Sequence, residues 1–257
     1  MARWILNADG ASTDELRRGL KAGAAAVMGV YRPELIAALR KLRREFDFDV
    51  YPVVPDAPTY VRDLADLGLI GAALKRLRRL APGGWVKLAS YGVKNVFGVL
   101  ASDFGTMLGV TVQMELPAFA PFRPPVVFLH HQMTDLLLAC RNTAGYRAFA
   151  ALARQAGAEP GLETRNFGHL LPLLRQAGAD VTCVAAPFNP LGYRMRPSAS
   201  ACEALLADRT VRVLAEDPSA QRSVDTEKAR AYVQARCLEA VVVHDDVAAK
   251  WIGVQGI

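Results

Sequence analysis

Residues 160–186 read PGLETRNFGHLLPLLRQAGADVTCVAA, and this stretch contains one complete unit of the predicted fold. It begins with the run PGLET (160–164) and ends with the apolar run VTCVAA (181–186). Between them, FGHLLPLLRQAG (167–178) has the apolar spacing of a helix that buries one face. An apolar run without polar alternation is typical of a strand buried on both faces of a parallel sheet. The stretch therefore predicts a strand, a crossover helix and a second parallel strand.

The same succession of apolar runs and helix-like stretches extends over nearly the whole chain. Eight runs are expected to form strands: RWILN (3–7), AAVMGV (25–30), DVYPVV (49–54), VVFLH (126–130), PGLET (160–164), VTCVAA (181–186), VRVLA (211–215) and LEAVVVH (238–244). Eight strand–helix units in 257 residues match the size of a (β/α)8 barrel. We therefore predict an α/β protein in which residues 1–257 form a single (β/α)8, or TIM, barrel domain.

Two parts of the chain depart from a regular barrel. Residues 57–124, between the third and fourth strands, are far longer than one crossover helix. Because loops that follow barrel strands emerge at the C-terminal face, we expect a helical, basic and apolar insertion there, acting as a lid or a docking surface. Only residues 245–257 follow the eighth strand, so the last helix is expected to be short. A rival interpretation places an additional strand within GVTVQMEL (109–116).

Composition and charge narrow the class of protein. Four cysteines without CxxC spacing, and no long uncharged apolar segment, predict reduced thiols in a cytoplasmic protein. The formal net charge is +6, and the segment 67–102 contains six lysine and arginine residues but no acidic residue. We expect this segment to contact a membrane surface or a second copy of the chain in a homo-oligomer. No nucleic-acid-binding module is recognisable, so nucleic acid is not an expected partner.

Polar residues that follow the predicted strands are the candidates for a site that binds a small-molecule substrate, because these positions meet at one mouth of the barrel. They are Asn7, Asp9, Tyr31, Asp56, His130, His131, Glu163, Arg165, Asn166, Asn189, Glu216, Asp217, His244, Asp245 and Asp246. A histidine at the end of the fourth strand can act as a general acid or base near neutral pH, or bind a metal. Asp9 and Asp56 are equally well explained as turn or capping residues.

A divalent metal is one open possibility for this mouth. Glu163, Glu216 and His244 could complete a site of carboxylate and histidine ligands. Dozens of residues separate them, however, and their spacing matches no metal-binding motif. We therefore assign no metal ligands from the sequence.

Anion binding is a second open possibility. The blocks TRNFG (164–168) and PFNPLGYRMRPS (187–198) each join a strand end to a helix start. Arg165, or Arg194 with Arg196, could hold a phosphate or a carboxylate there. Ordinary loop and capping roles explain the same residues equally well.

The second half of the chain resembles the aldo-keto reductase family of barrels in four places. VVFLHH (126–131) resembles the family's fourth strand, which ends in a histidine. GLETRNFGHLLPLLRQAG (161–178) resembles its fifth strand with the Ser-Asn-Phe turn and the helix that follows. VAAPFNPLG (184–192) resembles the sixth strand with its Asn-Pro-Leu loop, and VRVLAEDPSA (211–220) resembles the seventh strand. The order and spacing of these motifs, within residues 124–250, carry the resemblance.

The resemblance implies the family's barrel and the reduction of a carbonyl compound by a nicotinamide cofactor. It makes His130 the histidine of the catalytic pocket and Asn166 a contact to the nicotinamide carboxamide. Arg165 and Asn189 are expected to belong to the same cofactor-binding region. Tyr31, after the second strand, is the nearest candidate for the family's proton-donating tyrosine.

Other parts of the family's pattern are missing from the sequence. The third strand, YPVVPD (51–56), lacks the lysine expected at its end, and VMGVYRPE (27–34) lacks the aspartate expected near the second strand. After the eighth strand, His244, Asp245 and Asp246 stand where the family places a glycine and basic residues on the cofactor phosphate. Acidic residues there would repel a 2′-phosphate. NADPH and a divalent metal therefore both stay open as cofactors.

We predict an enzyme with an aldo-keto-reductase-like barrel that acts on a small or partly apolar carbonyl or sugar-like compound. The reaction is either oxidoreduction or proton transfer, as in an isomerase or lyase, with His130, Tyr31, His131 and Glu163 in the catalytic site. A metal-dependent hydrolase or lyase is one alternative. Another is a non-catalytic binding or assembly protein that docks through residues 57–124.

Overall fold

The computed structural model describes residues 3–56, 59, 62, 66, 104–207, 209–236 and 238–244. The basic segment 67–102, for which we predicted a lid or a docking surface, lies outside these residues. The chain end at 245–257, with its predicted short helix, lies outside them as well. The described part of the predicted insertion is mainly the helical stretch 104–122.

Eight parallel strands pair in sequence order and close into a barrel, with β8 beside β1. The strands are β1 (Arg3–Asn7), β2 (Ala26–Val30), β3 (Asp49–Val54), β4 (Val126–Leu129), β5 (Glu159–Glu163), β6 (Cys183–Pro187), β7 (Arg212–Glu216) and β8 (Ala240–His244). Each strand overlaps one of the eight predicted runs, and the ends differ by at most two residues. The predicted (β/α)8 fold is therefore confirmed.

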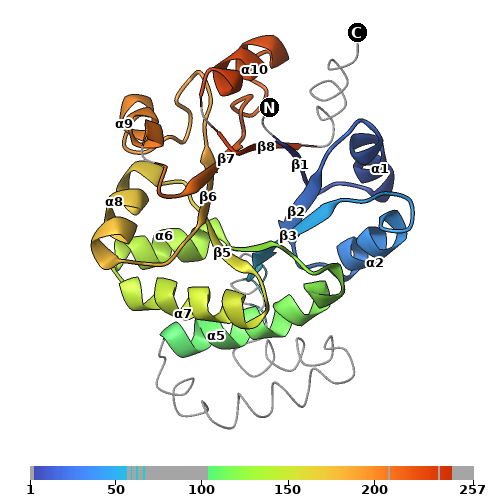
Figure 1. Cartoon of the computed structure of the whole chain (residues 1–257), viewed down its shortest axis with the longest axis horizontal. Helices are drawn as coiled ribbons and strands as arrows, with labels where there is room; N and C mark the ends of the chain where they lie inside the picture. Colours follow the sequence, from blue (N-terminus) through green and yellow to red (C-terminus); the bar gives the residue numbers. More distant parts are fainter. Residues whose placement is uncertain are drawn as a thin grey trace.

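The described helices lie outside the ring of strands (Figure 1). They are α1 (Thr13–Lys21), α2 (Pro33–Leu42), α5 (Phe104–Glu115), α6 (His131–Ala139), α7 (Thr143–Gln155), α8 (Phe167–Ala177), α9 (Ala199–Ala204) and α10 (Thr226–Gln234), with the 3-10 helices η1 (Leu116–Phe122) and η2 (Leu205–Ala207). The sequence did not predict α6, which gives the β4–β5 connection two helices. Within the described ranges, no helix is both long and apolar enough to cross a membrane.

The stretch that the rival interpretation assigned to an additional strand lies in a helix. Leu108, Val112 and Leu116 are buried at four-residue intervals, which is the spacing of one helix face. The helix α5 lies beside α7 (Figure 1) and contacts β3. At its end, the buried Glu115 side chain accepts a hydrogen bond of 2.9 Å from the backbone N–H of Asp56. This helix therefore connects β3 to β4, and the sheet has eight strands.

Apolar side chains fill two separate layers. One layer lies between the strands and the helices, and the other fills the inside of the barrel. The inner layer includes Met28, Phe128, Leu214 and Val242. Gly161 makes room for the Phe128 ring, because a Cβ atom at this position would lie 2.7 Å from two of its carbons. The inside of the barrel is therefore a packed core and not a pore.

The helix α1 begins with a capping box. The Ser12 hydroxyl accepts a hydrogen bond from the backbone N–H of Glu15, and the Glu15 carboxylate accepts one from the backbone N–H of Ser12. This reciprocal capping box satisfies N–H groups that a helix start leaves without partners.

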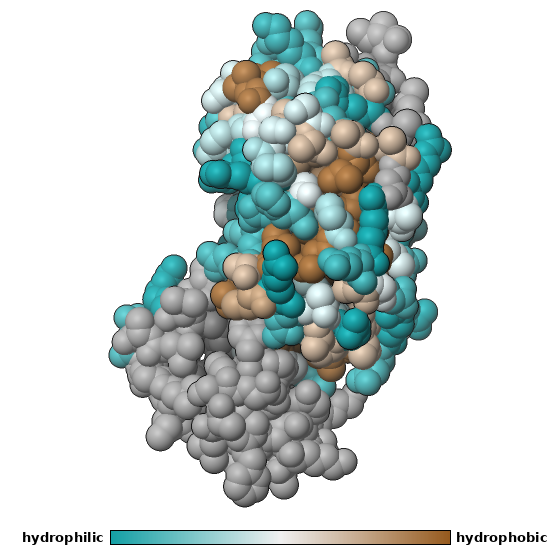
Figure 2. Space-filling model, turned by 90° about the vertical axis from the view of Figure 1, so that its left-hand side faces the viewer, coloured by the Kyte–Doolittle hydropathy of each residue, from teal (hydrophilic) through white to brown (hydrophobic). Residues whose placement is uncertain are grey.

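The surface over α8 and α9 is mixed in polarity. Figure 2, which views the molecule from the side where Figure 1 places these helices, shows hydrophilic residues over much of the coloured surface with hydrophobic residues among them. Within the described ranges, the large hydrophobic side chains that are exposed are Leu136, Leu191 and Tyr193.

Candidate active site

The inside of the barrel changes from apolar to polar at the C-terminal ends of the strands. Side chains alternate along a strand, so a residue two positions beyond an inward-facing residue also points inward. The residues two positions beyond the inner core of β1, β4, β5, β7 and β8 are Asn7, His130, Glu163, Glu216 and His244. All of them line one cavity of about 550 Å³, which we call the mouth cavity.

Most of the residues predicted from strand ends meet in the mouth cavity. Those that line it are Asn7, Asp9, His130, His131, Glu163, Arg165, Glu216, Asp217 and His244. The sequence missed three others that lie on the loop after β7, which are Ser219, Gln221 and Arg222. Arg194, which we had considered only for anion binding, also lines the cavity. Residues from six of the eight strand ends therefore face one space.

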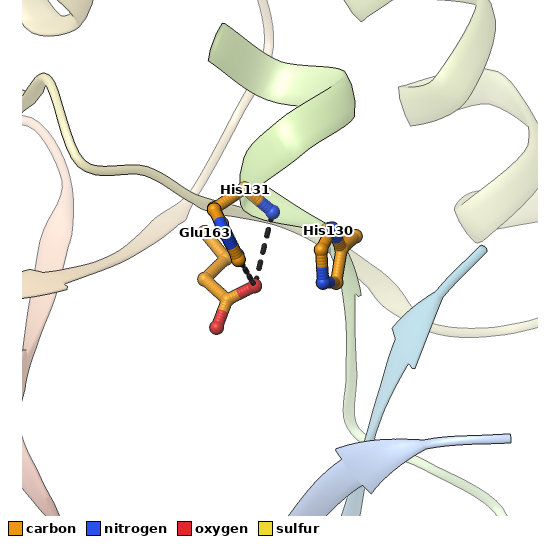
Figure 3. A group of neighbouring side chains, drawn as sticks. All are labelled: His130, His131 and Glu163. Atoms are coloured by element: carbon orange, nitrogen blue, oxygen red, sulfur yellow. Dashed lines mark hydrogen bonds and ion pairs between the residues drawn. The ribbon is translucent and has the colours of Figure 1, made fainter. Parts of the chain in front are cut away.

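His131 and Glu163 form a hydrogen-bonded pair (Figure 3). His131 is the first residue of α6, and its backbone N–H and ring Nδ1 lie 3.0 and 3.1 Å from Oε2 of Glu163 at the end of β5. Because an ionised carboxylate only accepts hydrogen bonds, Nδ1 carries the ring proton and Nε2 keeps a lone pair. A carboxylate that orients a histidine in this way prepares it to act as a base.

His130, at the N-cap of α6, is a neutral hydrogen-bond donor. Its Nδ1 accepts a hydrogen bond of 3.2 Å from the backbone N–H of Gln132, so the proton of the neutral ring is on Nε2. The residue is 6% exposed, and this burial lowers the pKa of His130 to about 4 although the charge of Glu163 acts in the opposite direction. The rings of His130 and His131 lie side by side, with centroids 4.2 Å apart. Neutral His130 therefore offers a donor, and the neutral form of His131 offers an acceptor.

Glu163 and Glu216 are buried carboxyl groups that face the same cavity and influence each other's charge. Burial acts to raise the pKa of Glu163, but the hydrogen bond and charge of His131 outweigh it and lower that pKa. For Glu216, burial and then the charge of Glu163 raise the pKa well above its ordinary value. The surroundings therefore push the two carboxyl groups in opposite directions, so that Glu163 favours its ionised form and Glu216 its protonated form.

Two further charged groups adjoin this pair. Nη1 of Arg165 lies 3.8 Å from Oε2 of Glu216, which is too long for a hydrogen bond. This Oε2 atom is buried and has no hydrogen-bond partner within the described residues. Burial, and then the charge of Glu163, also raise the pKa of Asp9, which has Arg32 at 4.0 Å. The cavity therefore holds acidic groups that keep protons more readily than they do in water.

The unpredicted helix α6 supports the loop after β5. The Asp135 carboxylate accepts hydrogen bonds of 2.5 Å from the Thr164 hydroxyl and 3.1 Å from the backbone N–H of Arg165. The Thr164 hydroxyl in turn accepts one of 2.9 Å from the backbone N–H of Asn166. Through His131 and Asp135, one short helix thus fixes both a candidate catalytic side chain and the loop beside it.

Three predicted site residues have other surroundings. The Tyr31 ring packs edge-on against Phe119 in the layer between strands and helices, with centroids 6.4 Å apart, and it does not line the mouth cavity. Asn189 is fully buried and bonds both ends of its amide to the backbone of Tyr193, at 2.9 Å each. Asn166 is the N-cap residue of α8 and lines a cavity next to the mouth cavity.

One group of side chains has the composition of a metal site. Ligand atoms of His130, His131 and Glu163 all lie within 4.8 Å of one another (Figure 3). Imidazole and carboxylate together suit several divalent transition metals. However, Oε2 of Glu163 already accepts two hydrogen bonds from His131, and these compete with a metal for the same oxygen. The observed hydrogen bonds favour proton transfer over metal binding.

Comparison with known proteins finds similarity at the level of structure. No family model matches the chain, and no curated protein matches it. An aldo-keto reductase enzyme from a Medee basin deep-sea metagenome library aligns with a TM-score of 0.56 at 10% identity, over 100% of this chain and 85% of the other. An aldo/keto reductase from Brucella melitensis aligns with a TM-score of 0.51 at 12% identity, over 97% and 86% of the two chains. The whole chain therefore has the barrel fold of aldo-keto reductases, as its sequence motifs predicted.

Proposed function

We propose that the protein is an enzyme that transfers a proton at the carbon next to a carbonyl group, as isomerases and lyases do, in a small sugar-like compound. The observation that carries the proposal is the buried Glu163–Glu216 pair, which faces the same cavity as His130 and His131 and whose two pKa values are shifted in opposite directions. Groups whose surroundings push their pKa values apart are suited to act as acid and base in one reaction. Because Val242 is the one apolar residue among the described residues that line the mouth cavity, a polar substrate fits this lining better than an apolar one.

The base in this scheme is His131. Its Nε2 lone pair takes the proton from the carbon beside the carbonyl, and the ring becomes an imidazolium. The Glu163 carboxylate, bonded to Nδ1, stabilises that positive charge and fixes the ring orientation. The same nitrogen returns the proton to the neighbouring carbon in an isomerisation, which leaves His131 ready for the next turnover.

In this scheme, His130 and Glu216 act on the carbonyl oxygen of the substrate. The Nε2–H group of neutral His130 donates a hydrogen bond to the carbonyl oxygen, on which negative charge develops as the carbon loses its proton. Glu216 gives its proton to that oxygen, and the enzyme then holds two carboxylates and one imidazolium in place of one carboxylate, one carboxylic acid and one neutral imidazole. Proton and charge counts therefore balance across the step. In an isomerisation, the hydroxyl group on the neighbouring carbon then gives its proton to Glu216 as it becomes the new carbonyl, which restores the starting state of the enzyme.

The described residues do not fit the nicotinamide-dependent reduction that the sequence resemblance implied. Such a reductase needs a tyrosine proton donor and a lysine beside it, whereas β3 here continues into Pro55 and Asp56. Tyr31 packs against Phe119 outside the mouth cavity. Asn189, one of the three residues expected in the cofactor-binding region, uses its amide to hold a loop. The proposed reaction therefore contains no hydride transfer.

Proton exchange with solvent tests the proposal without knowledge of the natural product. The purified protein would be incubated in D2O with EDTA, without nicotinamide, and with a panel of small aldoses and ketoses and their phosphates. Proton NMR would follow the signal of the C–H group beside each carbonyl. We expect the wild type to exchange this proton in at least one compound, and Glu163→Gln and Glu216→Gln to slow the exchange by about 100-fold or more. Glu34→Gln, which alters an exposed glutamate on α2, is the matched control.

Three results would contradict the proposal. The first is exchange that proceeds equally fast in both carboxyl variants. The second is a complete lack of exchange with every compound of the panel. The third is turnover that appears only after NADPH or a divalent metal is added, which would restore the reductase or the metal-dependent alternative. Unfolding curves of each variant, recorded in parallel, separate lost chemistry from lost structure.

A further inference from the structure

A second cavity, of about 440 Å³, opens beside the mouth cavity and is strongly basic. It is lined by His131, Arg165, Asn166, Arg194 and Arg196, and we call it the arginine cavity. No carboxylate is among these lining residues. Three of them, His131, Arg165 and Arg194, line the mouth cavity as well, so the two spaces adjoin.

Two loops build the arginine cavity, and the backbone joins them. Arg165 and Asn166 come from the loop between β5 and α8, and the other two arginines come from the loop between β6 and α9. The backbone N–H of Gly168 donates a hydrogen bond of 3.0 Å to the carbonyl oxygen of Arg196. Any Cβ atom at Gly168 would lie only 2.8 Å from that oxygen, so a glycine is required for this close approach. The buried amide of Asn189 holds the second loop in place.

The positive charges of the arginine cavity are poorly balanced within the protein. Arg194 lies over the ring of Tyr193, with 5.0 Å between its guanidinium carbon and the ring centroid. Neither Arg194 nor Arg196 forms an ion pair with any described acidic residue. The guanidinium group of Arg165 lies 3.8 Å from the carboxyl group of Glu216, which is too long for a hydrogen bond. Three guanidinium groups around one space therefore leave a positive potential that a bound anion would neutralise.

We infer that the arginine cavity binds the phosphate group of a phosphorylated, sugar-like substrate whose carbonyl end enters the mouth cavity. The carbonyl end rests on the proposed function, whereas phosphate binding rests on the arginines alone. A phosphate monoester carries a charge of about −1.5 to −2 near neutral pH, which suits three arginines better than the single charge of a carboxylate. Guanidinium groups also match phosphate oxygens with paired hydrogen bonds. Since His131 borders both cavities, a short molecule would place its phosphate and its reacting carbon on either side of it.

Direct binding of inorganic phosphate tests this assignment. Isothermal titration of the whole chain at low ionic strength would compare the wild type with the Arg194→Gln/Arg196→Gln double variant. Both side chains are exposed, so the fold should tolerate the change. We expect about tenfold weaker phosphate binding for each arginine removed, or about 100-fold for the pair. Arg40→Gln, which removes an exposed arginine on α2, is the matched control and should bind phosphate like the wild type.

Each other outcome has a definite meaning. Equal phosphate affinity in the wild type and the double variant, or no phosphate binding by the wild type, would overturn the inference. Acetate binding as tight as phosphate would reassign the cavity to carboxylates and overturn it too. Glu216→Gln should keep phosphate affinity while losing proton exchange, so failure of the proposed reaction and failure of the phosphate site are distinguishable.

Discussion

Replacing Glu216 by glutamine should change how the stability of the protein depends on pH. The glutamine amide has nearly the shape of a protonated carboxyl group. It cannot lose a proton, however. The variant therefore removes the one titrating proton that the Glu163–Glu216 pair holds in the folded protein, and it leaves the packing of the barrel mouth largely intact.

The sign and size of the effect follow from proton counting. A glutamate in the unfolded chain has a pKa near 4.3, so above about pH 5 the unfolded wild type has released its Glu216 proton. The folded wild type keeps it, because burial and the charge of Glu163 raise the pKa of Glu216 well above its ordinary value. Stability is thus fully present below the unfolded pKa and is lost as pH rises toward the folded pKa. Relative to Glu216→Gln, the wild type should lose ~1.4 kcal/mol of unfolding free energy for each pH unit in this range.

Urea denaturation at constant ionic strength, repeated at half-unit steps from pH 5 upward, measures this difference. The two proteins should be closest in stability at the acidic end and diverge steadily, with the variant becoming the more stable one. Glu34→Gln provides the comparison for removing an exposed glutamate. A stability difference between wild type and Glu216→Gln that stays constant across the range would mean that the folded pair holds no proton. That result would refute both the proton assignment and the acid role of Glu216.

Three other predictions concern single side chains. His130→Asn keeps an oxygen for the N-cap of α6 but cannot be protonated. Burial lowers the pKa of His130 to about 4, so the wild type should lose up to about 3 kcal/mol of unfolding free energy as pH falls from about 6.5 to 4. The variant should not show this loss in urea titrations over the same range. Gly161→Ala should cost about 1–3 kcal/mol, because the added carbon meets the Phe128 ring, and Phe128→Leu should recover part of that loss; a fully stable Gly161→Ala would show that the inner core is looser than described. Ser12→Ala should cost about 1 kcal/mol by removing the capping box, and an unchanged thermal midpoint would argue against that cap.

The strands of this barrel were predictable because their burial is the same on both faces. A strand covered by helices outside and by core inside needs apolar residues at every position. Such a run can be recognised from the local sequence, without knowing which strands or helices pack against it. The helix α6 escaped prediction for the opposite reason. In HQMTDLLLA (131–139) only Thr134 and Leu137 are fully buried, whereas Leu136 is exposed, so no apolar face stands out. Its N-cap is His130, which is not among the residues that commonly signal a helix start.

The members of the site were also largely predictable, since position after a strand end is enough to place a side chain near the mouth. Tyr31 shows the limit of that rule. It follows β2 directly, but its ring turns outward to Phe119 on η1, a segment nearly 90 residues later in the chain. Whether a residue just past a strand points inward or outward depends on where its backbone leaves the strand, and a sequence pattern does not contain that information.

The roles within the site depend on contacts that no single stretch of sequence contains. Glu163 and Glu216 are the same residue type, each at the end of a buried strand, yet the pKa of Glu163 is lowered and that of Glu216 is raised. The difference arises because β4 ends one residue before His130, so that α6 begins at His131 and directs both its backbone N–H and its Nδ1 at Glu163. Among the described residues, no donor reaches Oε2 of Glu216 within hydrogen-bond distance, and Nη1 of Arg165 lies 3.8 Å from it. The position at which one short helix starts thus gives two chemically identical side chains opposite pKa shifts. We expect that moving this start by one residue would remove the difference between them.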